Sequence, residues 1–324
     1  MNASQPGADV AELLGRGDDY LSSGDGKTAM VFYQAALKSA QSARFIDPDS
    51  LERLRKAQAF IHKRAEEFQE ELEAAFSGAR PAGKAARLRL EHSLEMLKGE
   101  RQIYQQQPAA FYYPYLAQRQ FFEREEFGWV PALEAQTKKI RDELAAVLAE
   151  GADFRPYIET NAERPYRDFH GLNEDPSWTA LYLLRHGVPV DENASRFPAT
   201  MAALQQVPLT SFGSRTPDVL FSRLEARAHI PPHTGILNCR LICHLPLIVP
   251  EGCWLRVGNE TRHWEEGKLL IFDDSMEHEA KNPTDELRII LLFDIWRPEL
   301  TGEERSAMSA VFDAIDRFRG VPEG

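Results

Sequence analysis

The spacing of apolar positions along the chain changes near residue 110. From about residue 8 to residue 108, apolar residues recur every three to four positions, which predicts a series of helices. Beyond residue 150 the spacing shifts towards two, which is typical of strands with one buried face. The expected strands are short and separated by Gly, Asn, Asp and Pro; they span residues 219–224, 239–249, 254–257, 268–272 and 287–295.

Short strands with no helices between them indicate antiparallel sheets, and we expect a double-sheet jelly roll. A helix over residues 129–150 precedes these strands. A further helix ends the chain, with Thr301 as its cap and Glu304 completing a capping box. The predicted fold class is therefore α+β, with a helical domain over residues 1–108 and a jelly-roll domain over residues 109–324.

The first helices carry small and aromatic residues at close intervals. These are Gly17, Tyr20, Gly24, Ala29, Tyr33 and Ala36, separated by offsets of 3, 4, 5, 4 and 3. Such spacing lets two antiparallel helices pack closely around a turn at Gly24-Asp25, which resembles one tetratricopeptide (TPR) repeat. A second copy is not evident. The domain is either a structural cap or a surface that recruits a protein partner.

Composition and charge narrow the class of protein. The 324 residues are 43% hydrophobic and carry a formal net charge of -12, so nucleic acid and anionic membranes are not expected partners. The three cysteines, clustered in one segment, are expected to be reduced thiols. No signal peptide and no apolar stretch of membrane-spanning length is visible. We expect a soluble, cytoplasmic protein.

Two histidines stand near the ends of expected strands. His233 lies at a turn that enters a strand, and His278 follows a strand. Two imidazoles from neighbouring strands can bind one divalent iron and leave positions for substrate and dioxygen. The commonest site of this kind adds a carboxylate two residues after the first histidine, but here that position is Gly235. Spacing alone therefore favours surface or hydrogen-bonding roles for both histidines.

The position of Arg288 adds support to iron binding by the two histidines. It lies ten residues after His278, on the next strand, among apolar residues of the same face. A buried arginine needs an anionic partner, and its planar fork suits a carboxylate. That carboxylate could be the distal one of 2-oxoglutarate, or it could belong to Asp273, Asp274 or Asp294 in an internal ion pair.

The segment from His233 to Leu300 carries a dense set of motifs. They are Pro232-His233-Thr234-Gly235, Asn238-Cys239-Arg240-Leu241, His244-Leu245, Glu251-Gly252-Cys253, Gly258-Asn259-Glu260-Thr261, Trp264-Glu265-Glu266-Gly267-Lys268, Ile271-Phe272-Asp273-Asp274-Ser275, Glu277-His278-Glu279, Arg288 and Asp294-Ile295-Trp296-Arg297-Pro298-Glu299-Leu300. This set resembles the aspartyl/asparaginyl β-hydroxylase family. A weaker resemblance extends back to Phe111-Tyr112-Tyr113-Pro114.

The resemblance implies a double-stranded β-helix of the jelly-roll, cupin-like kind. It also implies an Fe(II)- and 2-oxoglutarate-dependent dioxygenase. Such an enzyme hydroxylates an unactivated carbon and releases succinate and CO2. The expected target is the β-carbon of an aspartyl, asparaginyl or related amino-acid substrate, which is peptide-bound, carrier-tethered or free.

The resemblance also assigns roles to single residues. His233 and His278 match the two iron ligands, and Gly235 matches the family's own missing carboxylate, where water is expected. Arg288 and Ser222 match residues that bind the distal carboxylate of 2-oxoglutarate. His244 matches a residue that lies near the metal-side carboxylate of 2-oxoglutarate.

Two further residues are candidates on position. Asp274, four residues before His278, could orient water or an imidazole at the metal. Arg240 shares a strand face with His244, so it is the candidate for an acidic group of the substrate or cosubstrate.

Departures from the family pattern limit the substrate assignment. Ile242 stands where members acting on aspartyl side chains carry another arginine. Residues 192–196 lack the cysteines of relatives from the secretory compartment, which fits a bacterial-type cytoplasmic member.

Two other functions stay open. An iron-dependent halogenase would place a halide beside Gly235, and a non-catalytic jelly-roll binding module would need no iron.

Overall fold

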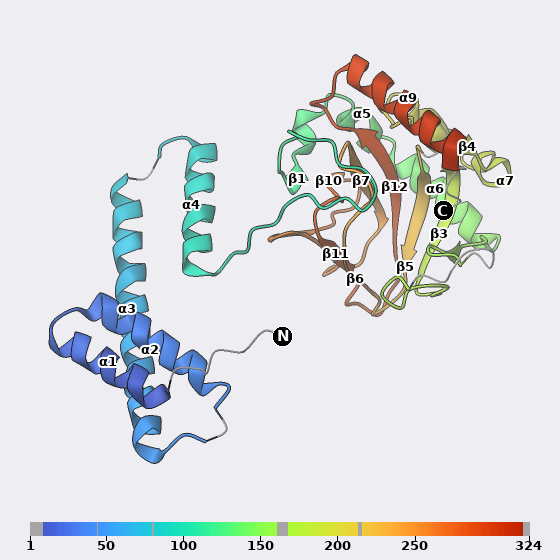
Figure 1. Cartoon of the computed structure of the whole chain (residues 1–324). Coiled ribbons are helices and arrows are strands. Elements are labelled where there is room, and N and C mark those ends of the chain that lie inside the picture. Colours follow the sequence, from blue (N-terminus) through green and yellow to red (C-terminus); the bar gives the residue numbers. More distant parts are fainter. Residues whose placement is uncertain (1–8, 44, 80, 161–167, 213–215, 320–324) are drawn as a thin grey trace. The chain divides into compact units, whose positions relative to one another are not determined.

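The computed structural model (Figure 1) describes residues 9–43, 45–79, 81–160, 168–212 and 216–319. The chain forms two compact units, Met1–Arg101 and Gln102–Gly324. Over the described residues, no helix combines the length and apolar character needed to cross a membrane.

The N-terminal unit is entirely helical in its described part. Its helices are α1 (Val10–Ser22), α2 (Gly26–Ala40), α3 (Pro48–Ala79) and α4 (Lys84–Lys98). Asp25 caps α2 by accepting a hydrogen bond from the Thr28 backbone at 3.0 Å. A Cβ on Gly17 would lie 2.4 Å from the Tyr33 ring, so glycine is required where α1 packs on α2. This confirms the close packing expected of the two helices, while their likeness to a TPR repeat stays a prediction.

The second unit begins earlier than the predicted boundary at residues 108 and 109. Helix α4 ends at Lys98, and Gly99 caps it in the left-handed region at φ +76°. Gln106 then donates to Asp273 at 2.6 Å, and the Gln107 backbone donates to the Ser275 carbonyl at 2.7 Å. These hydrogen bonds tie residues 102–108 to the jelly-roll unit.

Two antiparallel sheets form the second unit. The larger sheet has the order β1 (Phe121–Phe122), β10 (Leu270–Phe272), β7 (Arg240–Ile248), β12 (Arg288–Trp296), β5 (Val219–Leu224), β3 (Trp178–Arg185), β2 (Arg155–Pro156), and β4 (Val188–Pro189) pairs with β3. The smaller sheet has the order β6 (His229–His233), β11 (His278–Lys281), β8 (Trp254–Val257), β9 (Glu260–His263). Sheets joined in this way give the mixed helix-and-sheet, jelly-roll architecture expected from the sequence.

Side chains alternate between two cores along β7. Leu241, Cys243 and Leu245 pack in a core shared with the helices that cover the larger sheet. Those helices include α5 (Val130–Glu134), α6 (Thr137–Ala149) and α8 (Pro198–Leu204). Ile242 belongs instead to a core that contains residues of both sheets. The predicted alternation is confirmed, and it turns Arg240 and His244 towards the space between the sheets.

The remaining helices differ little from the prediction. The expected helix over residues 129–150 is divided into α5 and α6. At the break, the Thr137 hydroxyl donates a hydrogen bond to the Glu134 carbonyl at 2.6 Å, in competition with the helical backbone bond. The short helices are η1 (Arg124–Glu126) and α7 (Asp191–Ala194), and α9 (Gly302–Arg319) follows the last strand. The predicted capping box of α9 is present, with Thr301 backbone and hydroxyl each 2.8 Å from the Glu304 carboxylate.

Candidate functional site

A cavity of about 340 Å³ lies between the two sheets. Both sheets and the segments before β3 and β5 contribute to its wall. Its charged and imidazole-bearing lining residues are His186, Asp218, His233, Arg240, His244, Asp274, His278, Arg288 and Asp294. Every site residue singled out from the sequence, Ser222 included, lies in this wall.

His233 and His278 face each other across the ladder of β6 and β11. They are paired in register, and their ring centroids lie 4.1 Å apart. Nδ1 of His233 lies 2.8 Å from the Pro231 carbonyl, and Nδ1 of His278 lies 3.0 Å from the Met276 carbonyl. A carbonyl only accepts hydrogen bonds, so each Nδ1 carries the proton and each Nε2 keeps its lone pair.

Burial makes both imidazoles neutral. It lowers the pKa of His233 to about 3, with the neighbouring His278 as a further cause. It lowers the pKa of His278 to about 4. A neutral imidazole with a free Nε2 is the form that binds a transition metal. The pair therefore has the chemistry of metal ligands at neutral pH.

The position two residues after His233 has no room for a side chain. A Cβ on Gly235 would lie 2.0 Å from Oδ2 of Asp274. The Gly235 backbone also donates to the Asp274 carbonyl at 2.6 Å. Within the described part of the chain, no group of three or more His, Cys, Asp or Glu is arranged to hold a metal. The two imidazoles thus stand beside the Asp274 carboxylate without a third ligand of the usual kind.

Arg240 meets acidic groups of the chain itself. Its Nη2 lies 3.2 Å from Oδ2 of Asp274, and its Nη1 lies 3.3 Å from Oδ2 of Asp294. Nε of Arg240 and Oδ1 of Asp274 have no hydrogen-bond partner among the described residues. Burial raises the pKa of Asp274, and the Arg240 guanidinium opposes that rise.

Arg288 is 1% exposed and has no ion pair with any described residue. Its Nη1 donates to the Ser222 carbonyl at 3.2 Å and to the Ser222 hydroxyl at 3.4 Å. Burial lowers the pKa of Arg288 to about 10. The internal ion pair considered for Arg288 is not formed, because Asp274 and Asp294 pair with Arg240.

The third acidic candidate, Asp273, also has another partner. Arg297 is fully buried and lies 2.7 Å from its Oδ2. Asp273 further accepts hydrogen bonds from Gln106 and from the Ser275 backbone at 3.0 Å. This network fixes the segment that carries Asp274 and leads to His278.

Unsatisfied nitrogen atoms gather around Arg288. They are Nε of Arg288, Nδ1 of His244 and Nε1 of Trp264, all buried and without a partner among the described residues. The Arg288 guanidinium lies 4.9 Å from the centre of the Trp264 ring, and the His244 ring is 5.9 Å from it. Nε of Arg288 and Nε1 of Trp264 are N–H donors, and buried donors without acceptors are costly, so this end of the cavity is suited to an anion.

Sequence reasoning missed several residues of the wall. Trp264 is not itself a lining residue, but its ring faces the Arg288 guanidinium, which does line the cavity. Tyr157 and Asp218 lie in the wall but belong to segments without a motif. Trp178 also lines the cavity, and its indole donates to the Ser222 hydroxyl at 3.2 Å.

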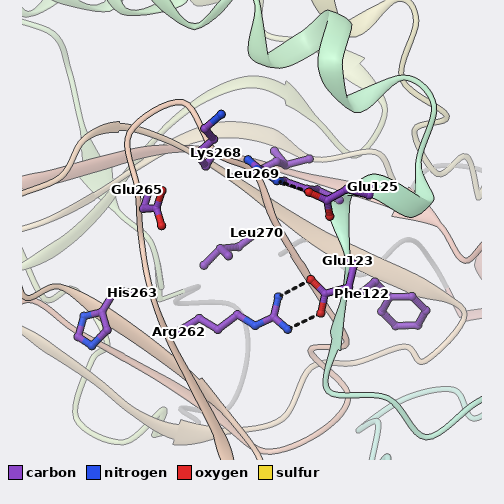
Figure 2. A pocket seen from close by; sticks show the side chains of 10 residues that line it. Phe122, Glu123, Glu125, Arg262, His263, Glu265, Lys268, Leu269 and Leu270 are labelled. Atoms are coloured by element: carbon purple, nitrogen blue, oxygen red, sulfur yellow. Dashed lines mark hydrogen bonds and ion pairs between the residues drawn. The ribbon is translucent and has the colours of Figure 1, made fainter. Parts of the chain in front are cut away.

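A second hollow lies elsewhere on the jelly-roll unit, with a volume of about 450 Å³ (Figure 2). Four of its charged groups form ion pairs: Arg262 lies 2.8 Å from Glu123 (Figure 2), and Arg124 lies 3.0 Å from Glu125. It contains neither the imidazole pair nor a buried unpaired cation. The cavity between the sheets is therefore the candidate active site.

The sequence profile described as aspartyl/asparaginyl beta-hydroxylase matches residues 134–298, half of the chain. The chain belongs to the aspartyl/asparaginyl β-hydroxylase family. This match contains both imidazoles, Gly235 and Arg288. The description of this family refers to β-hydroxylase activity.

Individual relatives share this part of the chain. The chain is 39% identical over 185 residues to human aspartyl/asparaginyl beta-hydroxylase, covering 56% of this chain and 23% of the human protein. It is 37% identical over 175 residues to the ornithine lipid ester-linked acyl 2-hydroxylase of Rhizobium tropici, covering 53% of this chain and 58% of that protein. The similarity thus spans less than two thirds of either relative.

Among solved structures, the cupin domain of Schizosaccharomyces pombe Cnp3 aligns with 46% of this chain and 75% of its own, with 9% identity and a TM-score of 0.27.

Proposed function

We propose that this protein is a hydroxylase, an Fe(II)- and 2-oxoglutarate-dependent dioxygenase that acts on an unactivated carbon of an amino-acid-containing substrate. One observation carries the proposal. Arg288, a buried guanidinium without an acidic partner among the described residues, lines the same cavity as the two neutral imidazoles. A buried cation of this kind needs an anion. A dicarboxylate that also reaches a metal at the imidazoles would meet that need.

The iron would be held by Nε2 of His233 and of His278. Both rings are fixed through Nδ1 by backbone carbonyls, which is how proteins orient metal-binding histidines. Gly235 offers no side chain as a third ligand, so water would fill that position. Oδ1 of Asp274 lacks a partner among the described residues and can accept a hydrogen bond from such a water.

The 2-oxoglutarate would lie between the imidazoles and Arg288. Arg288 and the Ser222 hydroxyl would bind its distal carboxylate, and His244 would lie near the carboxylate at the metal. These three residues are buried, and the unpartnered nitrogens around Arg288 supply donors for an anion. When bound, iron and 2-oxoglutarate supply the oxidation of a carbon–hydrogen bond by dioxygen, with release of succinate and CO2.

The chain's own contribution is orientation and exclusion of water. Apolar residues of both sheets, among them Ile230, Leu255 and Ile290, surround the polar groups of the cavity. Exclusion of water by this apolar wall strengthens the binding of a carboxylate to Arg288, because no solvent competes for the guanidinium. It also protects the reacting carbon from side reactions.

The substrate is proposed at the level of class. The name of the human relative refers to aspartyl and asparaginyl residues, and that of the Rhizobium relative to the acyl chain of an ornithine lipid. Both substrates contain an amino acid, which supports an amino-acid-containing substrate here. Arg240, our candidate for substrate contact, would act through its unpartnered Nε or through the aspartates that it binds.

The test is anaerobic binding of Fe(II) and 2-oxoglutarate, followed by the weak metal-to-ligand absorption band. The wild type should give the band. His278→Ala should abolish it, and Arg288→Ala should require about 10- to 100-fold more 2-oxoglutarate. The matched control is Arg227→Ala, which removes an exposed guanidinium paired with Asp285 and should leave the band unchanged. Folded wild-type protein without a band would contradict the proposal and favour a binding module. A chloride-dependent product would favour a halogenase.

A further inference from the structure

The segment that leads into the jelly-roll unit contacts both stretches of chain that carry the imidazoles. We call residues 106–111 the entry segment. The Gln107 backbone donates to the Ser275 carbonyl at 2.7 Å, and the Ala109 backbone donates to the Gly235 carbonyl at 3.0 Å. Ser275 precedes one proposed iron ligand by three residues, and Gly235 follows the other by two. The backbone of the entry segment therefore joins the two ligand-bearing stretches.

A buried amide makes a second bridge between the same stretches. Gln106 is 6% exposed. Its Nε2 donates to Oδ2 of Asp273 at 2.6 Å, and its Oε1 accepts from Nδ2 of Asn238 at 3.0 Å. Asp273 lies in the stretch before His278, and Asn238 lies in the stretch after His233. Both polar ends of one side chain are thus used to hold the two stretches at a set separation.

The two partners of the Gln106 amide are themselves fixed. Asp273 also binds the buried Arg297 at 2.7 Å. Asn238 is fully buried, and its amide forms two hydrogen bonds with the Tyr113 backbone, at 2.6 Å and 2.8 Å. Buried polar groups that lose their partners are costly, so these groups resist displacement. Gln106 therefore connects two rigid points.

A short path leads from the entry segment to one imidazole. Ser275, which accepts from the entry segment, is followed by Met276, and the Met276 carbonyl lies 3.0 Å from Nδ1 of His278. The two stretches also meet directly, where the Gly235 backbone donates to the Asp274 carbonyl at 2.6 Å. A shift of either stretch would move a carbonyl that orients a ring or change the separation of the rings.

The proposed iron site depends strongly on such support. Its two imidazoles have ring centroids 4.1 Å apart, and Gly235 supplies no side chain as a third ligand. A metal held by few protein ligands gains less from each of them if they are not already in place, so the surroundings must set their spacing. Groups that orient metal ligands change metal affinity by about 10- to 100-fold when they are removed.

We propose that Gln106 is a positioning residue of the iron site. By bridging Asp273 and Asn238, its amide sets the spacing of the two imidazoles. The inference rests on the proposed function, since the imidazoles are its iron ligands. Gln106 acts through its two partners and not on the metal itself. Its loss should loosen the pair of rings without unfolding the sheets that carry them.

The test is an anaerobic titration of the full chain with Co(II), whose visible absorption reports the geometry of its ligands. Gln106→Met keeps the length of the side chain and removes both hydrogen bonds. It should weaken Co(II) binding about tenfold or more and change the absorption spectrum at saturation. A purely structural role would lower the free energy of unfolding but leave the spectrum of the bound metal unchanged.

The matched control is Thr200→Val in α8. It removes a fully buried hydroxyl that donates to Glu143 at 2.7 Å, outside the cavity. This variant should lose stability and keep the affinity and spectrum of the wild type. A second variant, Gln107→Pro, removes the N–H that Ser275 accepts, at a position with an exposed side chain. It should also weaken Co(II) binding, and it decides the question if Gln106→Met does not fold.

Wild-type affinity and spectrum in folded Gln106→Met would overturn the inference. An equal loss of affinity in Thr200→Val would do the same, as would unchanged binding in Gln107→Pro when Gln106→Met does not fold. The proposed function fails in a different way: the wild type binds Co(II), but Fe(II) with 2-oxoglutarate gives no absorption band. A folded wild type that binds no metal would overturn both.

Discussion

The Asp274 carboxylate occupies the space that a side chain on Gly235 would need. A Cβ at residue 235 would lie 2.0 Å from Oδ2 and 2.4 Å from Cγ of Asp274. The carboxylate cannot retreat easily, because Arg240 binds the same Oδ2 at 3.2 Å. The packing of Asp274 against Gly235 therefore leaves no room for a side-chain ligand at position 235.

Restoring a carboxylate at position 235 should therefore harm the site. We expect Gly235→Asp to lower iron affinity, and Gly235→Ala to lower the free energy of unfolding by about 1–3 kcal/mol through overpacking. Iron titration and urea unfolding measure the two effects. The double variant Gly235→Asp with Asp274→Gly should recover iron binding, because it removes the collision. Tighter iron binding by Gly235→Asp alone would contradict this account.

Trp264 should hold the Arg288 guanidinium in place for the cosubstrate. The ring lies 4.9 Å from that guanidinium, and a buried cation–π contact contributes about 0.5–2 kcal/mol. Trp264→Leu should weaken 2-oxoglutarate binding by about 3- to 30-fold, with iron affinity unchanged. Trp264→Phe keeps an aromatic face and should lose less. Equal losses in the two variants, or a matching loss of iron, would indicate a general packing defect.

The buried pair of Arg297 and Asp273 should dominate the stability of the segment before His278. Both side chains are fully buried, and Nη1 of Arg297 lies 2.7 Å from Oδ2 of Asp273. Arg297→Met leaves the Asp273 carboxylate buried without its cation, which should cost about 3–5 kcal/mol in the free energy of unfolding. Arg227→Ala, at an exposed pair, should cost less than about 1 kcal/mol. Urea unfolding compares them, and similar losses would show that burial of the pair is unimportant.

Stability without metal should fall as the pH drops below about 6.5. Folding lowers the pKa of His233 to about 3 and of His278 to about 4, whereas an unfolded histidine titrates near about 6.5. Below about pH 6.5 the unfolded state binds more protons, so the stability present above that pH is lost progressively towards about pH 4. Burial raises the pKa of Asp273 and Asp274, which acts in the opposite direction.

The histidine contribution is isolated by comparing variants. The drop in unfolding free energy between about pH 7 and about pH 5 should be smaller in His278→Gln than in the wild type, because the variant lacks one such group. Urea unfolding of metal-free protein at the two pH values measures it. An identical drop in both proteins would mean that the imidazoles are not buried in their neutral form.

Local sequence determined the elements and the main candidates of this protein. Alternation along residues 240–248 is a property of the extended chain, so it predicted which side chains of β7 face the cavity. Thr301 and Glu304 lie three residues apart, so their capping box needed no distant contact. The motifs around His233, His278 and Arg288 indicated the family for the same reason, since each is a short run of residues.

Only the tertiary structure decided which charges meet. Arg240 and Arg288 both lie on inward faces of the larger sheet, and the sequence suggested Asp274 and Asp294 as partners for Arg288, with Arg240 as a contact for the substrate or cosubstrate. The register of β12 with β7 sets Asp294 opposite Ile242. Arg240 lies on the same strand face as Ile242, and it forms an ion pair with the Asp294 carboxylate. Arg288 is left with Ser222 and Trp264. Strand register and sheet packing are set by contacts between distant residues, so local spacing does not reveal them.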